Sequence, residues 1–438
     1  MNIVEERIMK TSRLVVAFAC LVIAGCGGGG NAETVAGIDA RGTPVAVVSQ
    51  GTISSFGSVV VNGVRYDTNG ATFVVDGSTG SESDLAVGDV VTVKGTIGSS
   101  GTTGTADSVQ FDDIVEGPVS AVDVVANTIT VLGQIVQVSA DTSFDDNISP
   151  ASIDGVMAGM IVEVSGFRLS DETISATRIE AKPAGGEFEV TGTVNNLAAT
   201  TFEIGALTVN YSAAQIDDFP AGSIQNGQRV EAKGTNLGAG GELLATRVEF
   251  KGDNLGIEDG DQVEIEGFIT RFVSATDFDV SGSPITTIGS TVFEGGTAAD
   301  LGLNVKVEVE GETDANGVVV ASKVDIRRAK AVRATALVDS VDAAAGSIVL
   351  LGITVNTDEL TRIEDKSSAD VDPLTITDIN AGDYVEVRGD EFPAGSGAIL
   401  ATIFEREDVD TESELQGFIE TESDPDFTIL GVTTVSYT

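Results

Sequence analysis

The side chains that carry most enzyme chemistry are scarce in this sequence. The 438 residues contain no histidine and two cysteines, Cys20 and Cys26. Without histidine there is no Ser-His-Asp triad, no imidazole general base and no imidazole ligand for zinc or copper. No glycine-rich phosphate loop or dinucleotide pattern follows a strand and opens a helix. We therefore expect a protein that is not an enzyme, with no catalytic residue, no cofactor and no metal ligand to assign.

Carboxylates are the abundant reactive groups. The chain has 68 Asp and Glu residues against 24 Lys and Arg, a formal charge of −44. Paired carboxylates can hydrolyse glycosides, but any acidic surface offers many such pairs. Two oxygen-rich segments, Asp145–Asn147 and Asp314–Gly317, carry the ligands that Ca²⁺ prefers, although neither matches the twelve-residue EF-hand loop. Solvated turns explain both segments and are the favoured interpretation.

The charge and the few aromatic residues limit the partners. A surface of this sign repels phosphates and anionic head groups, so we expect no nucleic-acid binding. The same charge favours a soluble, extended, self-repelling chain. Sugar sites often stack rings on aromatic side chains, but Trp is absent and the chain has 4 Tyr residues. Its phenylalanines, such as Phe144, Phe202 and Phe293, stand in strand patterns typical of a core.

The amino-terminal segment is the second place where chemistry is expected. Three basic residues, Arg7, Lys10 and Arg13, precede the apolar run Leu14–Ala24. This run is shorter than the roughly 20 residues that span a bilayer. It ends in Leu21–Cys26, an aliphatic residue and small residues before a cysteine. The arrangement resembles the signal peptide and lipobox of bacterial lipoproteins, which implies that residues 1–25 are removed and that Cys26 is lipidated. Either Met1 or Met9 can serve as the start.

Cys26 would then be the mature terminus and the anchor in the membrane. Four glycines follow it, Gly27–Gly30, and they favour a flexible tether over residues 26–45. The aspartate typical of inner-membrane retention is missing at position 27, so the resemblance implies an exported protein anchored in the outer membrane, on its periplasmic or surface face. No other cysteine remains in the mature chain, which excludes an internal disulfide.

Three signals recur in fixed order along the rest of the chain. The first is a strand, a turn whose second residue is glycine, and a second strand. Asn62-Gly63 is its clearest example, because both positions of a type I′ turn need a positive φ. The other copies turn at Gly133, Gly205, Gly282, Gly352 and Gly431.

The second signal is a tight turn that leads into an alternating strand. It begins as Gly88-Asp89-Val90 and closes at Gly95, and four further copies start at Gly159, Gly227, Asn304 and Gly382. Asparagine is the residue after glycine that best tolerates the left-handed region, so we predict a positive φ at Asn304. Alternating valines and charges predict one buried strand face.

The third signal follows 10 to 12 residues later, and Ala176–Glu180 is a clear copy. Apolar and polar residues alternate in it as well. We expect its basic residues, Arg178, Arg247 and Lys323, to face outward glutamates of the preceding strand as cross-strand pairs.

About five strands in roughly 70 residues are enough for a small closed barrel. The sequence therefore predicts an all-β fold of tandem small antiparallel, OB-like β-barrels after the signal peptide. We place the units at residues 46–114, 115–186, 187–260, 261–330, 331–411 and, for a partial sixth, 412–438. The partial unit indicates either a truncated chain or a hairpin that docks on a neighbour.

The order of these signals over residues 46–438 resembles a repeat family of bacterial lipoproteins, domain of unknown function 5666. That family implies no activity, substrate or site residues. Within the chain, Asp89 is replaced by Met160, Gln228, Val305 and Asp383 in the other copies. A catalyst or ligand needed in every unit would not vary in this way, so Asp89 is interpreted as a turn residue.

These observations predict a non-enzymatic, lipid-anchored cell-envelope protein that acts as a spacer or protein-interaction scaffold. The alternative is a surface module that binds polysaccharide or calcium. Its partners are the membrane, through lipid on Cys26, and an unidentified envelope protein or glycan.

Overall fold

The computed structural model describes residues 45–434, except for 57, 99–100, 140, 221, 253–254, 258, 328–331, 359–360, 372, 393–395, 411–412, 418–420 and 424–425. The predicted signal peptide, Cys26 and nearly all of the tether lie outside the described residues. Among the described residues, no helix has the length and apolar character needed to cross a membrane.

The first unit is a closed ring of five strands. In ring order, β1 pairs with β2, β3, β7 and β6 in turn, and β6 returns to β1. A ring with an odd number of strands cannot alternate direction throughout, so one pair must be parallel, and this pair is β3 with β7. The five strands are β1 (Val45–Ser55), β2 (Val59–Val61), β3 (Val64–Asp67), β6 (Val90–Ile97) and β7 (Thr103–Phe111).

The second, fourth and fifth units close in the same order. Their parallel pairs are β10 with β13, β23 with β25, and β28 with β31. Unit 2 comprises β8 (Val115–Asp123), β9 (Thr128–Val131), β10 (Gln134–Gln137), β12 (Ile161–Arg168) and β13 (Ile174–Lys182). Unit 4 comprises β21 (Gln262–Ser274), β22 (Asp277–Val280), β23 (Ser283–Glu294), β24 (Lys306–Thr313) and β25 (Val319–Arg327). Unit 5 comprises β26 (Val332–Asp342), β27 (Ser347–Leu350), β28 (Ile353–Asn356), β30 (Tyr384–Glu391) and β31 (Ile399–Glu407).

The third unit keeps this strand order, but its strands are divided between two sheets. One sheet contains β14, β18, β20 and β17, and the other contains β15, β16 and β19. Its apolar residues share a single core cluster with those of unit 2, so the two units bury their cores together. The strands are β14 (Phe188–Thr193), β15 (Thr201–Ile204), β16 (Leu207–Asn210), β17 (Gln215–Asp217), β18 (Arg229–Gly234), β19 (Leu243–Leu244) and β20 (Arg247–Phe250).

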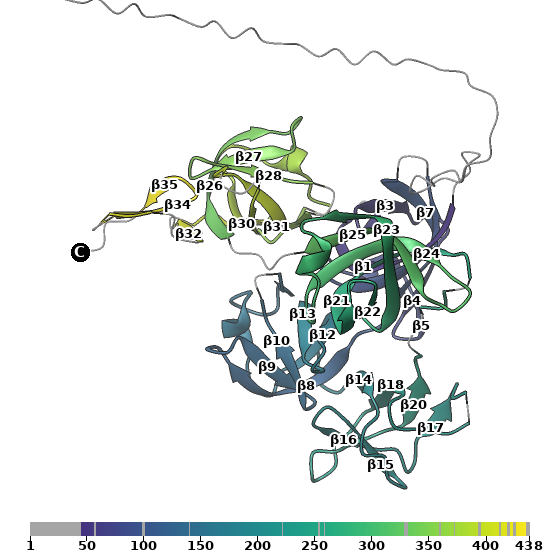
Figure 1. Ribbon diagram of the computed structural model, residues 1–438. Helices are drawn as coiled ribbons and strands as arrows, with labels where there is room; N and C mark the ends of the chain where they lie inside the picture. Colours follow the sequence, from purple (N-terminus) through teal and green to yellow (C-terminus); the bar gives the residue numbers. More distant parts are fainter. Residues whose placement is uncertain are drawn as a thin grey trace, which may run out of the picture.

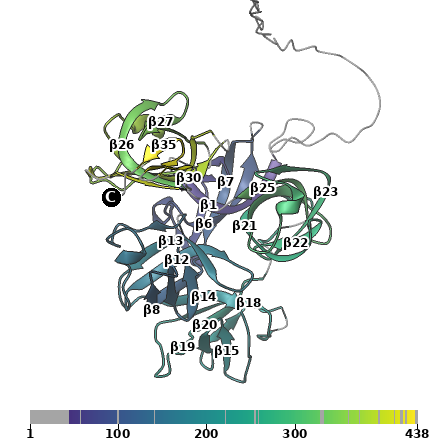
Figure 2. The ribbon, with the colours of Figure 1, turned by 60° about the vertical axis from the view of Figure 1, so that its left-hand side comes forward.

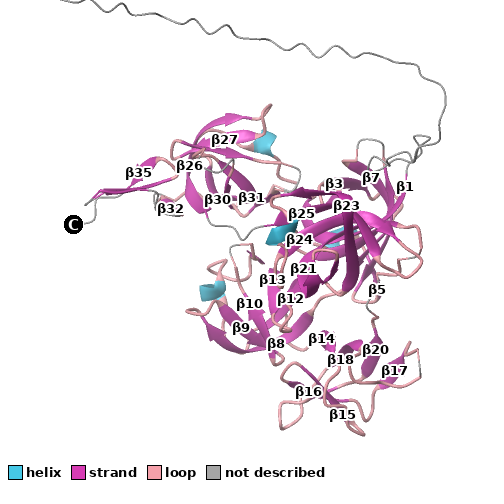
Figure 3. Ribbon diagram, viewed as in Figure 1, coloured by secondary structure: helices cyan, strands magenta, loops and turns pink. Residues whose placement is uncertain are grey.

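The predicted all-β fold of tandem small OB-like barrels is confirmed, and Figure 3 shows strands in every unit with only short helical turns. The prediction described the barrels as antiparallel and did not include the one parallel pair of each ring. The short helical turns are η1 (Glu82–Asp84), η2 (Ile153–Gly155), η3 (Ala298–Asp300) and η4 (Ile376–Asp378). Short strands also pair in parallel with the last strand of their units, namely β4 (Thr72–Val75), β11 (Ser143–Phe144), β17 and β29 (Arg362–Asp365).

The turns adopt the expected backbone in most copies. Asn62 and Gly63 have φ of 52° and 76°, as a type I′ turn requires, and Asn304 has φ of 62°. Unit 3 differs, because β15 ends at Ile204 and Gly205 is the first turn residue. The glycine that closes the second signal is required for a steric reason. A Cβ on Gly95 would lie 2.1 Å from the carbonyl oxygen of Thr105, at a bulge between β6 and β7.

The units pack against one another, as Figures 1 and 2 show, so the expectation of an extended chain is wrong. Strand β1 of unit 1 adds in parallel to β21 of unit 4, from Val47–Gln50 to Gln262–Ile265. Strand β8 of unit 2 pairs with β14 of unit 3. Paired edges and buried ion pairs between units offset the repulsion expected from the net charge.

The segment after unit 5 docks on that unit. Strand β32 (Glu414–Gln416) pairs with β26, and Ile429 and Leu430 belong to the core cluster of unit 5. The predicted hairpin is present in β33 (Thr421–Ser423), β34 (Asp426–Ile429) and β35 (Val432–Thr434), which form a three-stranded sheet. Of the two expectations for this segment, docking on a neighbour is the one observed.

Candidate functional site

A polar feature repeats in units 2 to 5. In each of these units the strand of the second signal places a carboxylate directly opposite a carboxylate of the last strand. The opposed pairs are Glu163 with Glu180, Glu231 with Glu249, Glu308 with Asp325, and Glu386 with Glu405. In unit 1 the same positions hold the uncharged residues Thr92 and Gln110. Like charges directly opposite each other destabilise a sheet, so each pair needs a compensating group.

A basic side chain supplies that compensation in each of the four units. The ammonium of Lys182 lies 2.8 Å from a carboxylate oxygen of Glu163 and 3.0 Å from one of Glu180. Lys251 lies 2.8 Å from Glu231. Arg327 forms ion pairs with Glu308 and Asp325, and Arg388 forms them with Glu386 and Glu405.

This feature is not visible when the units are compared at Asp89, where the residue varies. The recurring residue lies three positions later. A glutamate follows the first buried valine of the second signal at Glu163, Glu231, Glu308 and Glu386. All four glutamates are buried.

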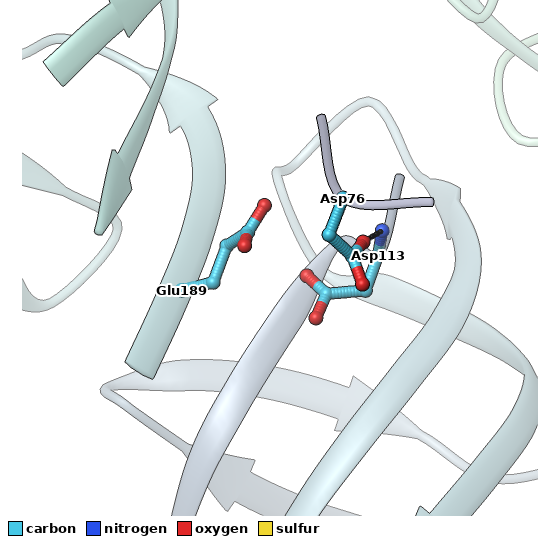
Figure 4. Close-up of side chains that lie close together, drawn as sticks. All are labelled: Asp76, Asp113 and Glu189. Carbon is cyan, nitrogen blue, oxygen red and sulfur yellow. Dashed lines mark hydrogen bonds between the residues drawn. The ribbon is translucent and has the colours of Figure 1, made fainter. Parts of the chain in front are cut away.

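Among the described residues, carboxylates also gather where units 1, 2 and 3 meet. Asp76, in the turn after β4, approaches Asp113, in the linker between β7 and β8, and Glu189 on β14 (Figure 4). One oxygen atom from each of these three carboxylates lies within 4.8 Å of the others. The backbone N–H of Asp113 donates a hydrogen bond to Asp76 Oδ1 at 3.1 Å, which fixes the linker against the turn.

Strand pairing brings two more carboxylates to the same place. Glu116 on β8 is paired with Glu163 on β12 at one side and with Glu189 on β14 at the other. Oxygen atoms of Asp113, Glu116 and Glu163 also lie within 4.8 Å of one another. Asp113 therefore belongs to both groups. We call these five residues the junction cluster: Asp76, Asp113, Glu116, Glu163 and Glu189.

Two lysines border the junction cluster. Lys182 pairs with Glu163, and Lys233 lies 2.6 Å from Glu189 and 3.4 Å from Glu231. Lys233 also donates to the carbonyl oxygen of Asp76 at 3.1 Å. Burial raises the pKa of Glu163 to about 8 and raises the pKa of Asp113 well above its usual range. The environment therefore disfavours the full negative charge of the cluster.

The contact between units 2 and 5 has the opposite character. The guanidinium of Arg362 donates to the carbonyl oxygens of Thr177, at 3.3 Å, and of Asp141. Lys366 donates to the carbonyl oxygen of Phe144 at 3.2 Å, and Arg388 to that of Thr142 at 3.2 Å. Basic side chains of unit 5 thus bind the backbone of unit 2.

The variable residues of the second turn share one role in four of the five copies, the exception being Val305 of unit 4, whose side chain has no acceptor. Asp89 Oδ2 accepts a hydrogen bond from the backbone N–H three residues earlier, at 2.7 Å, and side-chain atoms of Met160, Gln228 and Asp383 accept the same bond in their units. The interpretation of Asp89 as a turn residue is confirmed. Asp89 also lies 3.9 Å from the guanidinium of Arg178 in unit 2, and burial raises its pKa to about 7.

Both oxygen-rich segments form Asx turns. Asp145 Oδ1 accepts from the backbone of Asn147 at 3.0 Å, and Asp314 Oδ1 accepts from Asn316 at 2.8 Å. Their carboxylates are therefore used in local backbone bonds, as the turn interpretation predicted.

The expected cross-strand pairs are found in one case of three. Lys323 stands opposite Glu310, with the ammonium 2.9 Å from the carboxylate. Arg178 stands opposite Ser165 instead, and Arg247 stands opposite Lys233 and pairs with Asp217 at 2.8 Å. The register is the same in the three units, since each partner precedes the closing glycine, but this position holds Ser165 in unit 2 and Lys233 in unit 3 where unit 4 has Glu310.

Most aromatic side chains that the structure describes point away from solvent. Tyr66 and Tyr384 are buried, as are Phe144 and Phe202, while Phe293 and Tyr211 are half-buried. Phe392 is exposed. The described residues thus offer no row of exposed rings on which a polysaccharide could stack; Tyr437 lies outside them.

Comparison with known proteins gives a family and little else. The family described as Domain of unknown function (DUF5666) matches residues 47–110, 116–180, 191–249, 266–325 and 335–403. No curated protein matches the chain. Among solved structures, "drosophila Unr CSD456" is similar over 50% of this chain and 98% of its own, with 16% sequence identity and a TM-score of 0.13. A likeness at that score carries no argument.

Proposed function

The chain belongs to the DUF5666 family, and from that premise we propose that it is a non-enzymatic scaffold of the cell envelope, anchored by lipid on Cys26. The observation that carries the proposal is the pairing of strands between units. β1 with β21 joins units 1 and 4, and β8 with β14 joins units 2 and 3, each pair through backbone hydrogen bonds. Such a body presents several barrel surfaces in a fixed arrangement, as an interaction scaffold requires.

The same packing favours a scaffold over a simple spacer. A spacer gains reach by keeping its units in a line, whereas unit 1 contacts units separated from it by 200 residues or more: the Ser49 hydroxyl donates to Glu264 at 3.0 Å, 215 residues away. Small-angle X-ray scattering tests this choice. We expect a radius of gyration not far above the value of about 21 Å for a compact chain of roughly 390 residues. A value near that of five barrels in a line would contradict it.

The scaffold role is tested by capture from envelope extracts with the soluble fragment 31–438, which retains every described residue. We expect specific protein partners, and no nucleic acid because of the charge of −44. Capture of glycan alone, with no protein, would favour the alternative of a polysaccharide-binding module.

The anchor is tested separately. Cells that express the full chain are labelled with a palmitate analogue, and we expect label on the wild type and none on Cys26→Ala. Equal labelling of the two chains would remove Cys26 as the lipidated residue and, with it, the outer-membrane location that the lipobox implies.

A further inference from the structure

Asp113 is a buried carboxylate without a partner. Its exposed fraction is 2%, and neither of its oxygen atoms accepts a hydrogen bond from any residue that the structure describes. The side chain points toward Asp76 (Figure 4), but only the backbone N–H of Asp113 is hydrogen-bonded to the Asp76 carboxylate, and it is the donor. A carboxylate in this position loses its hydration and gains nothing in return. A positively charged ligand would remove that deficit.

We propose that the junction cluster binds a divalent hard cation, Ca²⁺, between the carboxylate of Asp113 and those of Asp76 and Glu189. Glu116 and Glu163 place further carboxylate oxygen atoms beside Asp113, which belongs to both groups. The inference rests on the geometry of this junction and is independent of the proposed scaffold function.

The balance of charge supports a cation. Five carboxylates meet in the junction cluster, and two lysines make ion pairs with it, Lys182 with Glu163 and Lys233 with Glu189. Each lysine is shared with a further glutamate, Glu180 or Glu231. The basic side chains therefore neutralise the outer carboxylates and leave Asp113 uncompensated. One Ca²⁺ supplies the missing two positive charges where the deficit is largest.

The chemistry of the donors selects the kind of ion. The cluster offers carboxylate oxygens alone, and the chain has no histidine and no cysteine beyond Cys26, so soft or borderline metals lack their usual ligands. Mg²⁺ demands near-ideal octahedral geometry, whereas Ca²⁺ accepts six to eight oxygens in irregular arrangements. Ligands that come from a turn, a linker and a strand of three different units suit the less demanding ion.

Ca²⁺ at this place would fasten three units at once. Asp76 belongs to unit 1, Asp113 to the linker that joins units 1 and 2, and Glu189 to unit 3. Unit 3 has the interrupted barrel and shares its core with unit 2, so we expect the link to stabilise this unit more than the others. We therefore expect calcium to raise the melting temperature of the whole chain.

The test uses the full chain, purified in a non-ionic detergent and stripped with a chelator. Titration calorimetry and thermal melting are carried out at pH 7 with calcium chloride and with magnesium chloride. For the wild type we expect saturable calcium binding and a rise in melting temperature of about 5 °C or more at roughly 1 mM calcium. Asp113→Asn should lower the calcium affinity at least tenfold, because the shared ligand is lost.

A matched control is available in unit 4. Glu264 stands three residues before the glycine of β21, as Glu189 does in β14, and it is also buried, but it lies in neither carboxylate group. Glu264→Gln should keep the calcium affinity of the wild type. If Asp113→Asn does not fold, Asp76→Asn and Glu189→Gln are measured in its place and should show the same loss.

Three results would overturn the proposal. One is a wild type that binds no calcium and whose melting temperature does not change. Another is an equal calcium response in the wild type and in the variants of the cluster. A third is a magnesium response as large as the calcium response, which would reject the choice of ion. If the carboxylates are instead held neutral by protons, Asp113→Asn will be at least as stable as the wild type without calcium, and calcium will have no effect.

Discussion

Two junctions of this molecule bury charge in opposite ways. Between units 2 and 5, Arg362 and Lys366 donate to backbone carbonyls, so each buried cation has at least one partner that does not titrate, although Lys366 also pairs with Glu364 and Asp146. Between units 1, 2 and 3, carboxylates meet carboxylates, and Asp113 has no hydrogen-bond partner among the described residues. The first junction is complete within the chain. The second depends on what the solution provides, whether protons or a cation, so stability should respond to conditions more strongly there than at the junction of units 2 and 5.

The largest effect is expected for Lys233→Met, which removes a cation from the junction of units 1, 2 and 3. Its ammonium is buried against Glu189 and Glu231, and breaking one side of a buried ion pair costs about 3–5 kcal/mol. Urea denaturation at pH 7 should show this loss. At about pH 5 the loss should shrink, because the carboxylates left behind can take up protons. If Lys233→Met loses the same stability at pH 5 and at pH 7, the junction of units 1, 2 and 3 does not respond to pH and does not differ in this respect from the junction of units 2 and 5.

Arg362→Met is the corresponding change between units 5 and 2. Two charge-assisted hydrogen bonds to the carbonyl oxygens of Thr177 and Asp141 are lost, at about 1.5 kcal/mol or more each. Backbone carbonyls do not titrate, so the loss of stability should be the same at pH 5 and at pH 7. Arg271→Ala serves as the control. Its ion pairs with Asp277 and Asp279 are exposed, and we expect little change.

The smallest effect, taken per pH unit, concerns the junction of units 1 and 4. It tests whether another poorly compensated carboxylate behaves like the junction cluster. Burial, followed by the nearby charge of Glu308, raises the pKa of Glu264 to about 8. The folded chain therefore keeps a proton that the unfolded chain loses above its ordinary pKa of about 4.5. Stability from this group is highest below that value and falls as the pH rises toward 8, by at most about 1.4 kcal/mol per pH unit.

Glu264→Gln should accordingly flatten the pH dependence of stability between about pH 5 and pH 8. Urea denaturation at several pH values in that range gives the slope for both chains. If the slope of the variant equals that of the wild type, the carboxylate of Glu264 is not the source of the pH dependence.

The fold could be predicted from local signals, because a small barrel is built from turns and alternating strands. The positive φ at Asn304 and the type I′ turn at Asn62-Gly63 follow from single residues and are confirmed. The junction cluster could not be predicted in this way. Asp76, Asp113 and Glu189 lie in a turn, a linker and a strand of different units, and only the packing between units brings them together. Glu163 and its counterparts could have been predicted, since their recurrence is visible when the units are aligned at the second signal.

The parallel pairing of β1 with β21 has a consequence for the order in which the chain folds. Residues of β1 are synthesised about 215 positions before their partners in β21, so the edge of unit 1 stays open while units 2 and 3 are made. Closing so long a loop is slow compared with folding a single barrel. The pairing of β8 with β14 spans a far shorter stretch, and units 2 and 3 can dock first. Assembly is therefore expected to have two stages, with the open edge of β1 as the place where an unfinished chain is most exposed to aggregation.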